Sequence, residues 1–489
     1  MNDRTVHIEK GLFPLWDEHI TDTRHTDAEL SVNRPDRAGS VFKADMPWEG
    51  NNSCSFSVIH DGSVYRMYYE GRDWPQTHKT YICLAESADG LEWTRPDLGM
   101  IEFEGSVRNN IIFDDDASGV FVMIDGNPAC PADERIKLFT GQHYDCEDGH
   151  RIALRCLVSG DGVHFRFSHE LITPKYIFNM YDSVNTVYWD RHIGKYVCFF
   201  RTLHFKPTNT DKQFEESHAR AVWVMESDDC VHWGEGKPLD YMGGDDYQIY
   251  SNCVTPYICD DRYYIGFPTR YNERFEWNAS FERLTAKEMR LKRMTKDGKI
   301  DPGLKRQGLA VTDCLFMSSR DRERWFRFDE AALTPGPEDG YNWEYGDCYP
   351  AIGMIETPGR FSSEPELSLL CEAHHWTDAP VELIRYIYRK DGFASYKAGY
   401  KPKTLRTVPF TFNGGELSLN FRSSARGYVT VSFLDENGNA VEGYISCPHF
   451  GDTTDRVIDF DKPLAELSGR KVSLSFAMSD AEIYSMTFR

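Results

Sequence analysis

The sequence has no apolar run near the roughly 20 residues that a membrane-spanning helix requires. Its first residues, MNDRTVHIEKGLFPLWDEH, are charged throughout and contain no apolar core segment, so we expect no secretory signal. The 13 cysteines form no C-x-x-C pair and no zinc-ligand spacing. Scattered cysteines in an odd number are typical of reduced, mostly buried thiols. These absences predict a cytoplasmic protein with no disulfide framework, no membrane partner and no metal site.

A surplus of basic residues is also missing. The 55 Lys and Arg residues face 77 Asp and Glu residues, which gives a net charge of −22. Phosphate contacts need clustered cations, so we expect no nucleic-acid partner. The sequence has no G-x-S-x-G elbow, no P-loop, no H-E-x-x-H and no glycine-rich turn between a strand and a helix. We therefore expect neither a nucleotide nor any other cofactor.

A short motif recurs along the chain. Its copies are Ser87-Ala-Asp89-Gly90-Leu-Glu-Trp93, Ser159-Gly-Asp161-Gly162-Val-His-Phe165, Ser227-Asp-Asp229-Cys-Val-His-Trp233, Ser319-Arg-Asp321-Arg-Glu-Arg-Trp325 and, in degenerate form, Arg389-Lys-Asp391-Gly392-Phe393. The intervals between the aspartates are 72, 68, 92 and 70 residues. Copies at nearly even spacing predict five similar structural units.

Each unit reads as about four antiparallel strands. An apolar, β-branched or aromatic run precedes the motif, and two further strand-like runs lie upstream of it. The Ser-x-Asp-Gly segment has the composition of a tight turn. Radial repetition of four-stranded sheets makes a propeller. The sequence thus predicts an all-β protein with a five-bladed propeller over residues 46–398. A β-sandwich or a tandem of hairpins is the alternative, although the repeat spacing has no natural place in a sandwich.

The remaining segments flank or interrupt these units. Residues 1–45 are expected to pack on the propeller as an N-terminal segment. Residues 281–300 are rich in Glu, Lys, Arg and Leu and predict a helical insertion, either a solvated surface helix or a lid or oligomer contact. Residues 399–489 alternate apolar and polar positions between turns, which predicts a small β-sandwich as an accessory domain. The accessory domain is expected to give structural support or to bind carbohydrate.

Candidate catalytic groups are sought where the innermost strands of a propeller begin, because these starts line one mouth of the channel. Cleavage of a glycosidic bond needs two carboxyl groups on opposite sides of the bond, with pKa values pushed apart by their surroundings. The carboxyls predicted to act in catalysis are Glu49, Asp182 and Asp246. As an alternative, Glu49 only caps the start of the first unit.

Further polar and aromatic residues near these positions are predicted to bind the substrate. They are Trp48, Asn185, Arg201, Tyr247, Arg270, Asp347, Glu372 and Trp376. Arginine can hold sugar hydroxyls or a carboxylate, and aromatic rings can stack on a sugar face. For Arg270, an ion pair between units is the alternative. Residues 142–148 are acidic, and a solvated loop is favoured there over a calcium site.

Several of these segments resemble the five-bladed propeller glycoside hydrolases, the group that includes β-fructofuranosidases and arabinofuranosidases. The closest likeness is to bacterial members in which a β-sandwich follows the propeller. The segments that carry the resemblance are Pro47-Trp48-Glu49-Gly50, the run 87–99 with Asn109-Asn110, Asp182-Ser-Val-Asn185, Phe267-Pro-Thr-Arg270 and Asp391-Gly-Phe393.

The resemblance implies an exo-acting glycoside hydrolase for a furanoside or small oligosaccharide, with no cofactor and with oligomerisation possible. In well-understood members a Trp-x-Asn-Asp-Pro segment carries the nucleophile, and Arg-Asp-Pro and Glu-Cys segments carry the stabiliser and the acid. None of these three segments occurs in this sequence. In the first unit, Glu49 occupies the position at which those members have the nucleophilic aspartate. The reaction could therefore instead be transglycosylation or phosphorolysis, or the propeller could bind carbohydrate without catalysis.

Overall fold

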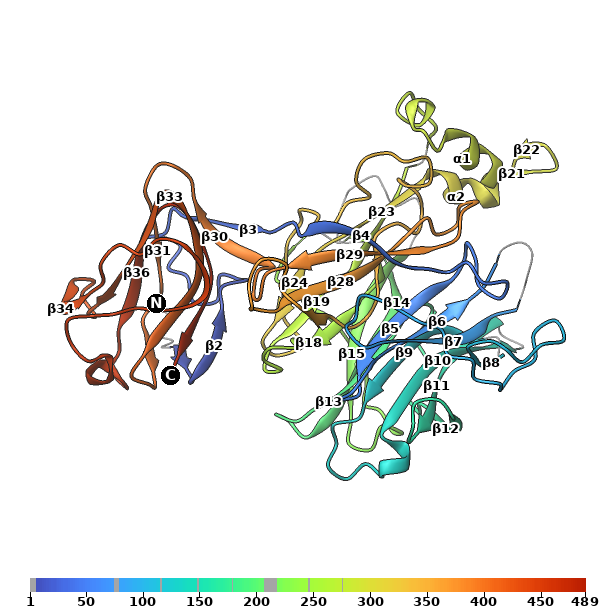
Figure 1. Cartoon of the computed structure of the whole chain (residues 1–489), viewed down its shortest axis with the longest axis horizontal. Helices are drawn as coiled ribbons and strands as arrows, with labels where there is room; N and C mark the ends of the chain where they lie inside the picture. The colour runs from blue at the N-terminus through green and yellow to red at the C-terminus, as the bar shows by residue number, and fades with distance from the viewer. Residues whose placement is uncertain are drawn as a thin grey trace. The chain divides into compact units, whose positions relative to one another are not determined.

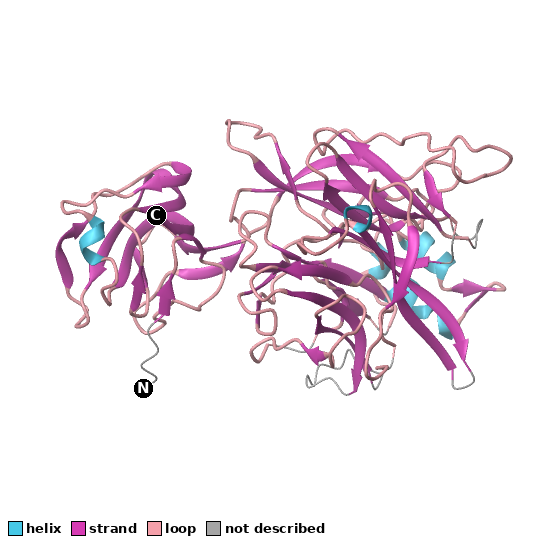
Figure 2. Cartoon of the chain, turned by 90° about the horizontal axis from the view of Figure 1, so that it is seen from below, coloured by secondary structure: helices cyan, strands magenta, loops and turns pink. Residues whose placement is uncertain are grey.

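The computed structural model describes residues 6–73, 79–114, 117–146, 149–177, 179–205, 218–244, 247–274 and 276–489. These residues form an all-β structure, as predicted, in which the helices are few and short (Figure 2). Its α-helices are α1 (Lys287–Arg293) and α2 (Lys305–Leu309), which lie within or just after the predicted insertion. No helix in the described part of the chain is long and apolar enough to cross a membrane.

Internal contacts divide the chain into two units. One consists of Met1–Pro35 together with Tyr388–Arg489, and the other is Asp36–Ile387. These boundaries differ from the expected 1–45, 46–398 and 399–489. The first 35 residues belong with the C-terminal part of the chain, not with the repeats.

Antiparallel sheets follow one another along the unit Asp36–Ile387 (Figure 1). Sheet one has the order β5-β6-β7-β8, with bounds Cys54–His60, Tyr65–Gly71, Tyr81–Ser87 and Ile111–Phe113. Sheet two is β12-β11-β10-β9, with bounds Arg166–Glu170, Gly149–Ser159, Ile136–Cys146 and Ala117–Ile124. Sheet three is β13-β14-β15-β16, with bounds Thr186–Asp190, Lys195–Phe205, His218–Ser227 and Lys237–Pro238.

The fourth repeat is built from two sheets. One is β17-β20-β23, with bounds Ile249–Ser251, Thr269–Glu273 and Ala310–Cys314. The other is β18-β19-β24-β25, with bounds Val254–Pro256, Tyr264–Gly266, Met317–Ser319 and Trp325–Arg327. A small hairpin, β21 (Thr295–Lys296) with β22 (Lys299–Ile300), extends the insertion.

The last sheet takes a strand from the start of the unit. Its order is β26-β28-β29-β4, with bounds Tyr349–Pro350, Glu366–Ala373, Glu382–Tyr388 and Asp36–Lys43, and β27 (Ile355–Thr357) also pairs with β28. The β4–β29 pairing closes the unit, because it joins a strand before sheet one to the last repeat. Strand β4 lies in the segment 1–45, which was expected to lie outside the repeats, but it forms the outer strand of the sheet of the fifth repeat.

The repeated motif forms the same turn in four copies. In the first copy, Ser87 Oγ accepts the Gly90 N–H at 2.9 Å and Asp89 Oδ1 accepts the Leu91 N–H at 2.8 Å. The other copies repeat this pattern around Asp161, Asp229 and Asp321. The residue after each aspartate has a positive φ of 67–78°, which a glycine fills in two copies.

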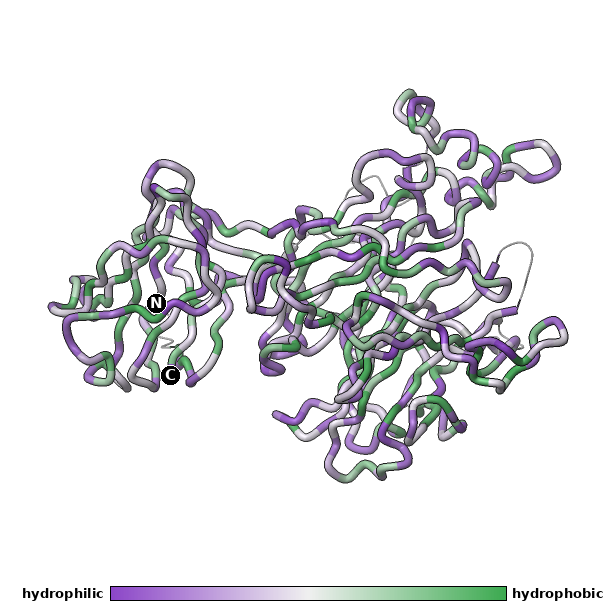
Figure 3. The backbone as a smooth tube through the Cα atoms, viewed as in Figure 1, coloured by the Kyte–Doolittle hydropathy of each residue, from purple (hydrophilic) through white to green (hydrophobic). Residues whose placement is uncertain are grey.

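The aromatic residue that ends the motif packs between neighbouring sheets. Phe165 of sheet two meets Tyr68 of sheet one edge-on at 5.9 Å, and Trp325 meets Phe199 of sheet three at 5.8 Å. Trp325 is fully buried. The apolar positions follow the strands of the sheets (Figure 3), so each sheet is held by side chains of its neighbours.

The unit formed by Met1–Pro35 and Tyr388–Arg489 has its own core. Its main sheet is β3-β30-β36-β33-β34, with β2, β31 and β35 paired at its sides. The bounds are Glu29–Val32, Ala394–Ala398, Ser473–Phe488, Leu417–Leu434, Ala440–Ile445, Gly11–Pro14, Lys403–Arg406 and Asp452–Val457. A parallel pair joins β1 (Val6–Ile8) to β32 (Phe410–Phe412). N-terminal side chains such as Phe13 and Ile20 are buried among C-terminal ones, which fixes the first segment in this unit.

Candidate functional site

One backbone feature recurs at the start of a strand in each repeat. A residue with positive φ lies in or just before β5, β9, β13, β18 and β26: Ser55 (57°), Gly119 (71°), Ser183 (101°), Cys253 (42°) and Cys348 (57°). We call the residues immediately before them the strand-start residues: Cys54, Ser118, Asp182, Asn252 and Asp347. Two of them, Asp182 and Asp347, are carboxylic acids.

These strand starts lie next to one another in space. The strands β5, β9, β13 and β18 contact each other in that order, and the Val58 N–H donates to Ile352 O at 2.7 Å, which joins β5 to the last sheet. Sheets two and three approach each other closely at Gly119. A Cβ atom at this position would lie 2.4 Å from Ser183 O, so a larger residue would not fit without a shift. Cys253 Sγ donates to Pro350 O at 3.3 Å, which joins β18 to β26. The five strands thus follow one another in a closed order, which we call the ring, and Asp182 and Asp347 lie on non-adjacent repeats.

Asp182 is held in a fixed and partly exposed position. Its side chain is 44% exposed, and its Oδ2 lies 3.4 Å from Arg201 Nη2 and accepts from Asn179 Nδ2 at 3.1 Å. Asn185 braces the loop, since its Nδ2 donates to Tyr181 O and Ser183 O and its Oδ1 accepts the Arg201 N–H.

Asp347 lies in the opposite environment. Its carboxyl is buried, and its Oδ2 accepts the Glu344 N–H at 2.6 Å. Burial, together with the charge of the nearby Glu344, raises the pKa of Asp347 to about 8, although the hydrogen bond from the Glu344 N–H lowers it. Asp347 therefore holds its proton at neutral pH. Glu344 is also buried, and burial raises its pKa to about 7 although Arg290 and Arg293 lower it.

A second buried carboxyl lies on the same sheet. Glu372 Oε1 accepts the Ser55 N–H at 3.1 Å, and its Oε2 lies 2.9 Å from His375 Nδ1. Burial raises the pKa of Glu372 well above its usual value and lowers the pKa of His375 to about 3. Trp376 stacks on His375 and on Tyr345, at 5.4 and 6.3 Å between ring centroids.

Tyrosines connect the two sides of this region. Tyr250 stacks on Tyr349 at 5.3 Å and meets Tyr345 edge-on at 5.6 Å. Arg201 Nη1 donates to Tyr250 O, and its guanidinium lies 5.1 Å from the Tyr250 ring. Asp182 and Arg201 on one side, and Asp347, Glu372 and Trp376 on the other, therefore border one aromatic cluster.

A chain of hydrogen bonds from sheet two reaches the same ring. Ser118 Oγ lies 2.9 Å from His143 Nε2, and His143 Nδ1 lies 2.8 Å from His150 Nε2. The hairpin register, with Asp145 opposite His150, brings the two histidines together. The sequence analysis missed this chain, because spacing alone does not give the register of a hairpin.

Glu49 does not join this group. Its side chain is fully buried, and it accepts hydrogen bonds from Tyr69 Oη at 2.5 Å and from Arg95 Nε and Nη2 at 2.8 and 2.7 Å. Both carboxylate oxygens are therefore occupied by protein donors. This bonding gives Glu49 the structural role that was the alternative in the sequence analysis.

We expect Glu49→Gln to destabilise the unit Asp36–Ile387 by about 2–3 kcal/mol, because it removes the buried carboxylate that accepts from Arg95 and Tyr69 and leaves Arg95 only the more distant Asp45, at 3.7 Å. Urea unfolding followed by fluorescence measures this change. Glu92→Gln, at an exposed position of the same sheet's motif, is the matched control and should change stability by less than about 0.5 kcal/mol. Equal stability of the two variants would contradict a structural role for Glu49.

Other predicted binding residues are also held by protein partners. Arg270 forms a two-point ion pair with Asp313, at 2.9 and 2.6 Å, and its guanidinium lies 5.0 Å from the Tyr247 ring. Trp48 Nε1 donates to Asn110 Oδ1 at 2.8 Å, and its ring packs on Phe103. Asp246 lies outside the described residues.

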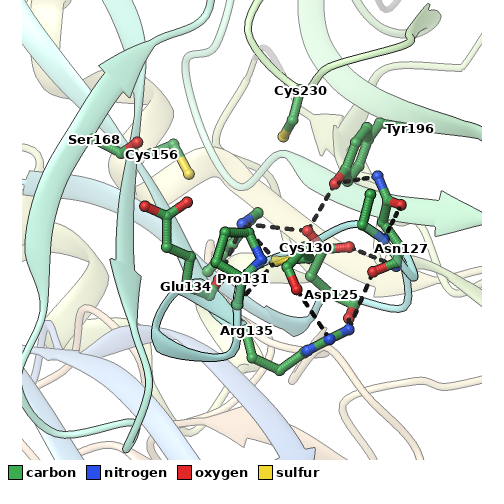
Figure 4. A network of polar contacts seen from close by, with 12 residues as sticks. Asp125, Asn127, Cys130, Pro131, Glu134, Arg135, Cys156, Ser168, Tyr196 and Cys230 are labelled. Carbon is green, nitrogen blue, oxygen red and sulfur yellow. Dashed lines mark hydrogen bonds and ion pairs between the residues drawn. The ribbon is translucent and has the colours of Figure 1, made fainter.

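Asp125 belongs to a structural network between sheets two and three (Figure 4). Its Oδ2 accepts from Tyr196 Oη at 2.8 Å and lies 3.2 Å from Lys137 Nζ, and its Oδ1 accepts the Asn127 N–H. All of these groups are protein donors, so the Asp125 carboxylate has a structural role in this network. The network cross-links two sheets at the ends of their strands away from Ser118.

The predicted insertion contributes directly to the candidate site. Arg290 and Arg293 of α1 are buried or nearly so, and both approach Glu344. Their spacing of three residues places them on one helix face. The insertion is therefore docked on the segment that carries Asp347, which sequence composition did not reveal.

The described residues contain no group of three or more His, Cys, Asp or Glu side chains arranged to hold a metal ion. The thirteen cysteines are free thiols, most of them buried. The acidic segment 142–148 falls partly outside the described residues, and its calcium alternative remains untested.

Comparison with known proteins finds no matching family model and no matching curated protein. Solved structures similar to the chain include an N-acetylgalactosamine deacetylase from F. plautii in complex with blood group B trisaccharide. The identity is 13%, the TM-score is 0.47, and the match covers 73% of this chain and 95% of that one.

A sucrose-6-phosphate hydrolase from Lactobacillus gasseri is similar at 9% identity and a TM-score of 0.43, over 91% of this chain and 93% of that one. An endo-arabinase from Bacteroides thetaiotaomicron is similar at 12% identity and a TM-score of 0.40, over 74% and 99%.

Proposed function

We propose that this chain is a glycosidase that acts in the mouth of a five-bladed propeller. The successive sheets, the positive φ repeated at their strand starts, and the closing β4–β29 pair support five blades. For the second unit, we keep the β-sandwich as a proposal, supported by its long antiparallel strands around one apolar core.

One observation carries the catalytic proposal: two carboxyl groups occupy equivalent positions in non-adjacent repeats but lie in opposite environments. Asp182 is partly exposed and faces a guanidinium, whereas Asp347 is buried with a pKa raised to about 8. Groups whose surroundings push their pKa values apart suit the base and acid of glycoside cleavage.

In the proposed reaction, Asp347 donates its proton to the leaving oxygen of the glycosidic bond. Asp182 attacks the anomeric carbon or removes a proton from the attacking water. Arg201 and Asn179 hold the Asp182 carboxylate in position, and Trp376 and the tyrosine cluster stack on the sugar. Glu372 and His375 act as positioning residues for the backbone at Ser55, because one Glu372 oxygen accepts the Ser55 N–H and the other is held by His375. We keep the exo-acting furanoside specificity as part of this proposal.

A turnover screen tests the proposal. Aryl furanosides, aryl pyranosides and oligosaccharides are incubated with the full chain, with and without inorganic phosphate, and released sugar is measured. We expect turnover of at least one class without phosphate. Turnover only with phosphate would replace hydrolysis by phosphorolysis, and sugar binding without any turnover would favour a non-catalytic propeller.

A further inference from the structure

Three arginines surround a cluster of tyrosines beside Asp182. The Arg201 and Arg220 guanidiniums lie 5.1 and 5.7 Å from the Tyr250 ring. Arg220 also lies 4.5 Å from the Tyr271 ring, and Arg306 lies 5.8 Å from the Tyr345 ring. Cations over tyrosine faces are attracted by the ring quadrupole. Each of the three guanidiniums is therefore held against a ring of the same tyrosine cluster.

The three tyrosines form a single packed group. Tyr250 and Tyr271 lie 6.2 Å apart, Tyr250 and Tyr345 lie 5.6 Å apart, and Tyr271 and Tyr345 lie 5.4 Å apart. Arg201 and Arg220 come from β14 and β15, whereas Arg306 comes from α2 after the insertion. Segments distant in the sequence therefore converge on this group, which we call the arginine–tyrosine cluster.

In the part of the chain that the structure describes, two carboxylates lie at the arginine–tyrosine cluster: Asp182 beside Arg201, and Glu273, which accepts from Tyr271 Oη at 3.0 Å and lies near Arg306. Three guanidiniums therefore share two carboxylates. Arg201 faces Asp182 at 3.4 Å, and Arg220 donates to the neutral Gln248 Oε1. Among the described residues, no hydrogen bond or ion pair joins the Arg306 guanidinium to an acceptor. In the same set of residues, Arg201 Nε and Arg220 Nε are buried and have no hydrogen-bond acceptor. The Arg201 residue as a whole is only 3% exposed.

The chain as a whole has a net charge of −22. Arg290 and Arg389 also have a buried nitrogen without an acceptor, but each has a carboxylate partner, Glu344 and Asp452 respectively. Within the described ranges, no ion pair joins Arg220 or Arg306 to a carboxylate. Burying guanidinium N–H groups without acceptors costs free energy unless a ligand supplies them. The unmatched donors border Asp182, where the sugar would lie.

We propose that the arginine–tyrosine cluster binds an anionic group of the substrate, a carboxylate or a phosphate. The inference deepens the proposed function, on which it rests, by making the substrate an acidic glycoside such as a uronide or a sugar phosphate. Guanidinium groups pair with both kinds of anion through two parallel hydrogen bonds. The tyrosine rings hold the arginines in place before the anion arrives.

Isothermal titration calorimetry at constant ionic strength tests this inference without requiring turnover. The probes are sodium glucuronate, sodium galacturonate, inorganic phosphate, glucose and galactose, each with the full chain. We expect at least one anion to bind about 10-fold or more tightly than the neutral hexoses. A uronate preference indicates a carboxylate ligand, and a phosphate preference indicates a phosphoryl ligand. Equal binding of charged and neutral probes, or no anion binding, overturns the inference.

Variants place the anion in the cluster. Arg306→Gln and Arg220→Gln are expected to weaken anion binding about 10-fold or more and to leave hexose binding unchanged. Arg306→Lys should retain part of the affinity, because it keeps the charge and loses the paired geometry. The matched control, Arg191→Gln, replaces an exposed arginine paired with Asp261 and should bind the anion as the wild type does. Unchanged anion binding in both cluster variants overturns the assignment.

The outcomes separate this inference from the proposed function. Anion binding that depends on Arg220 and Arg306, with no glycoside turned over, keeps the anion site and removes the glycosidase. Turnover of neutral glycosides with a KM that Arg306→Gln does not change removes the anion site and keeps the glycosidase.

Discussion

Asp182→Asn is expected to lower kcat by roughly 10³-fold on any glycoside that the wild type cleaves. The amide keeps the size of the side chain but can neither attack the anomeric carbon nor accept a proton. Because Asp182 is the carboxylate that faces the buried Arg201, the change should also lower the stability, so kcat is compared well below the unfolding temperature of the variant. Single-turnover and steady-state assays of released sugar, with thermal unfolding in parallel, measure both effects.

Asp228→Asn is the matched control for this variant. Asp228 is an exposed aspartate in the turn of the same sheet, with 85% of its side chain exposed, and its replacement should leave kcat unchanged. A fully active Asp182→Asn variant would remove Asp182 from the reaction and leave the proposed acid without a partner.

Asp347→Asn is expected to reduce kcat/KM by about 10²–10⁴-fold and to change the pH profile. Burial raises the pKa of Asp347 to about 8, so the wild type holds the acid proton below pH 8 and loses activity as the pH rises above it. Asparagine cannot donate that proton, so the residual activity of the variant should lack this alkaline limb. Aryl glycosides with a good leaving group should be affected least, because they need little protonation.

The raised pKa of Asp347 also makes the free energy of unfolding depend on pH. The folded state binds the Asp347 proton more tightly than the unfolded state, whose aspartate titrates near pH 4. The tighter binding of this proton stabilises the folded state fully below about pH 4. The stabilisation is lost as the pH rises to about 8, at about 1 kcal/mol per pH unit. Urea midpoints at pH 5, 7 and 9 should fall more steeply in the wild type than in Asp347→Asn. A parallel pH dependence in both proteins would contradict the buried, protonated state of Asp347.

The sequence supported much of the repeat architecture because its signals are local. The Ser-x-Asp turns follow from hydrogen bonds within four residues, as at Asp89 and Asp161, so composition and spacing suffice to place them. The alternation of apolar residues likewise marks strands without knowledge of their partners. The predicted all-β structure is confirmed on this basis.

The candidate site was anticipated only in part. The predicted residues that border the tyrosine cluster are Asp182, Arg201, Asp347, Glu372 and Trp376; of these, Asp182 and Asp347 were proposed from their positions near strand starts. Glu49 stands at a similar position in sequence, but its carboxylate turns into the protein and meets Arg95 and Tyr69. Which way a side chain points depends on the bulge and register of its strand, and neither can be read from a single sequence.

The sequence by itself determined the repeated strand-and-turn units, the acidic charge and the aromatic residues that pack between sheets. Only the tertiary structure decided that β4 closes the last sheet, that residues 1–35 belong with the C-terminal unit, and that Arg306 meets Tyr345. The reason is physical: turns and strand patterns arise from contacts between near neighbours in the chain. The β4–β29 pairing and the arginine–tyrosine cluster instead depend on contacts between residues far apart in sequence, which form only when the whole chain has folded.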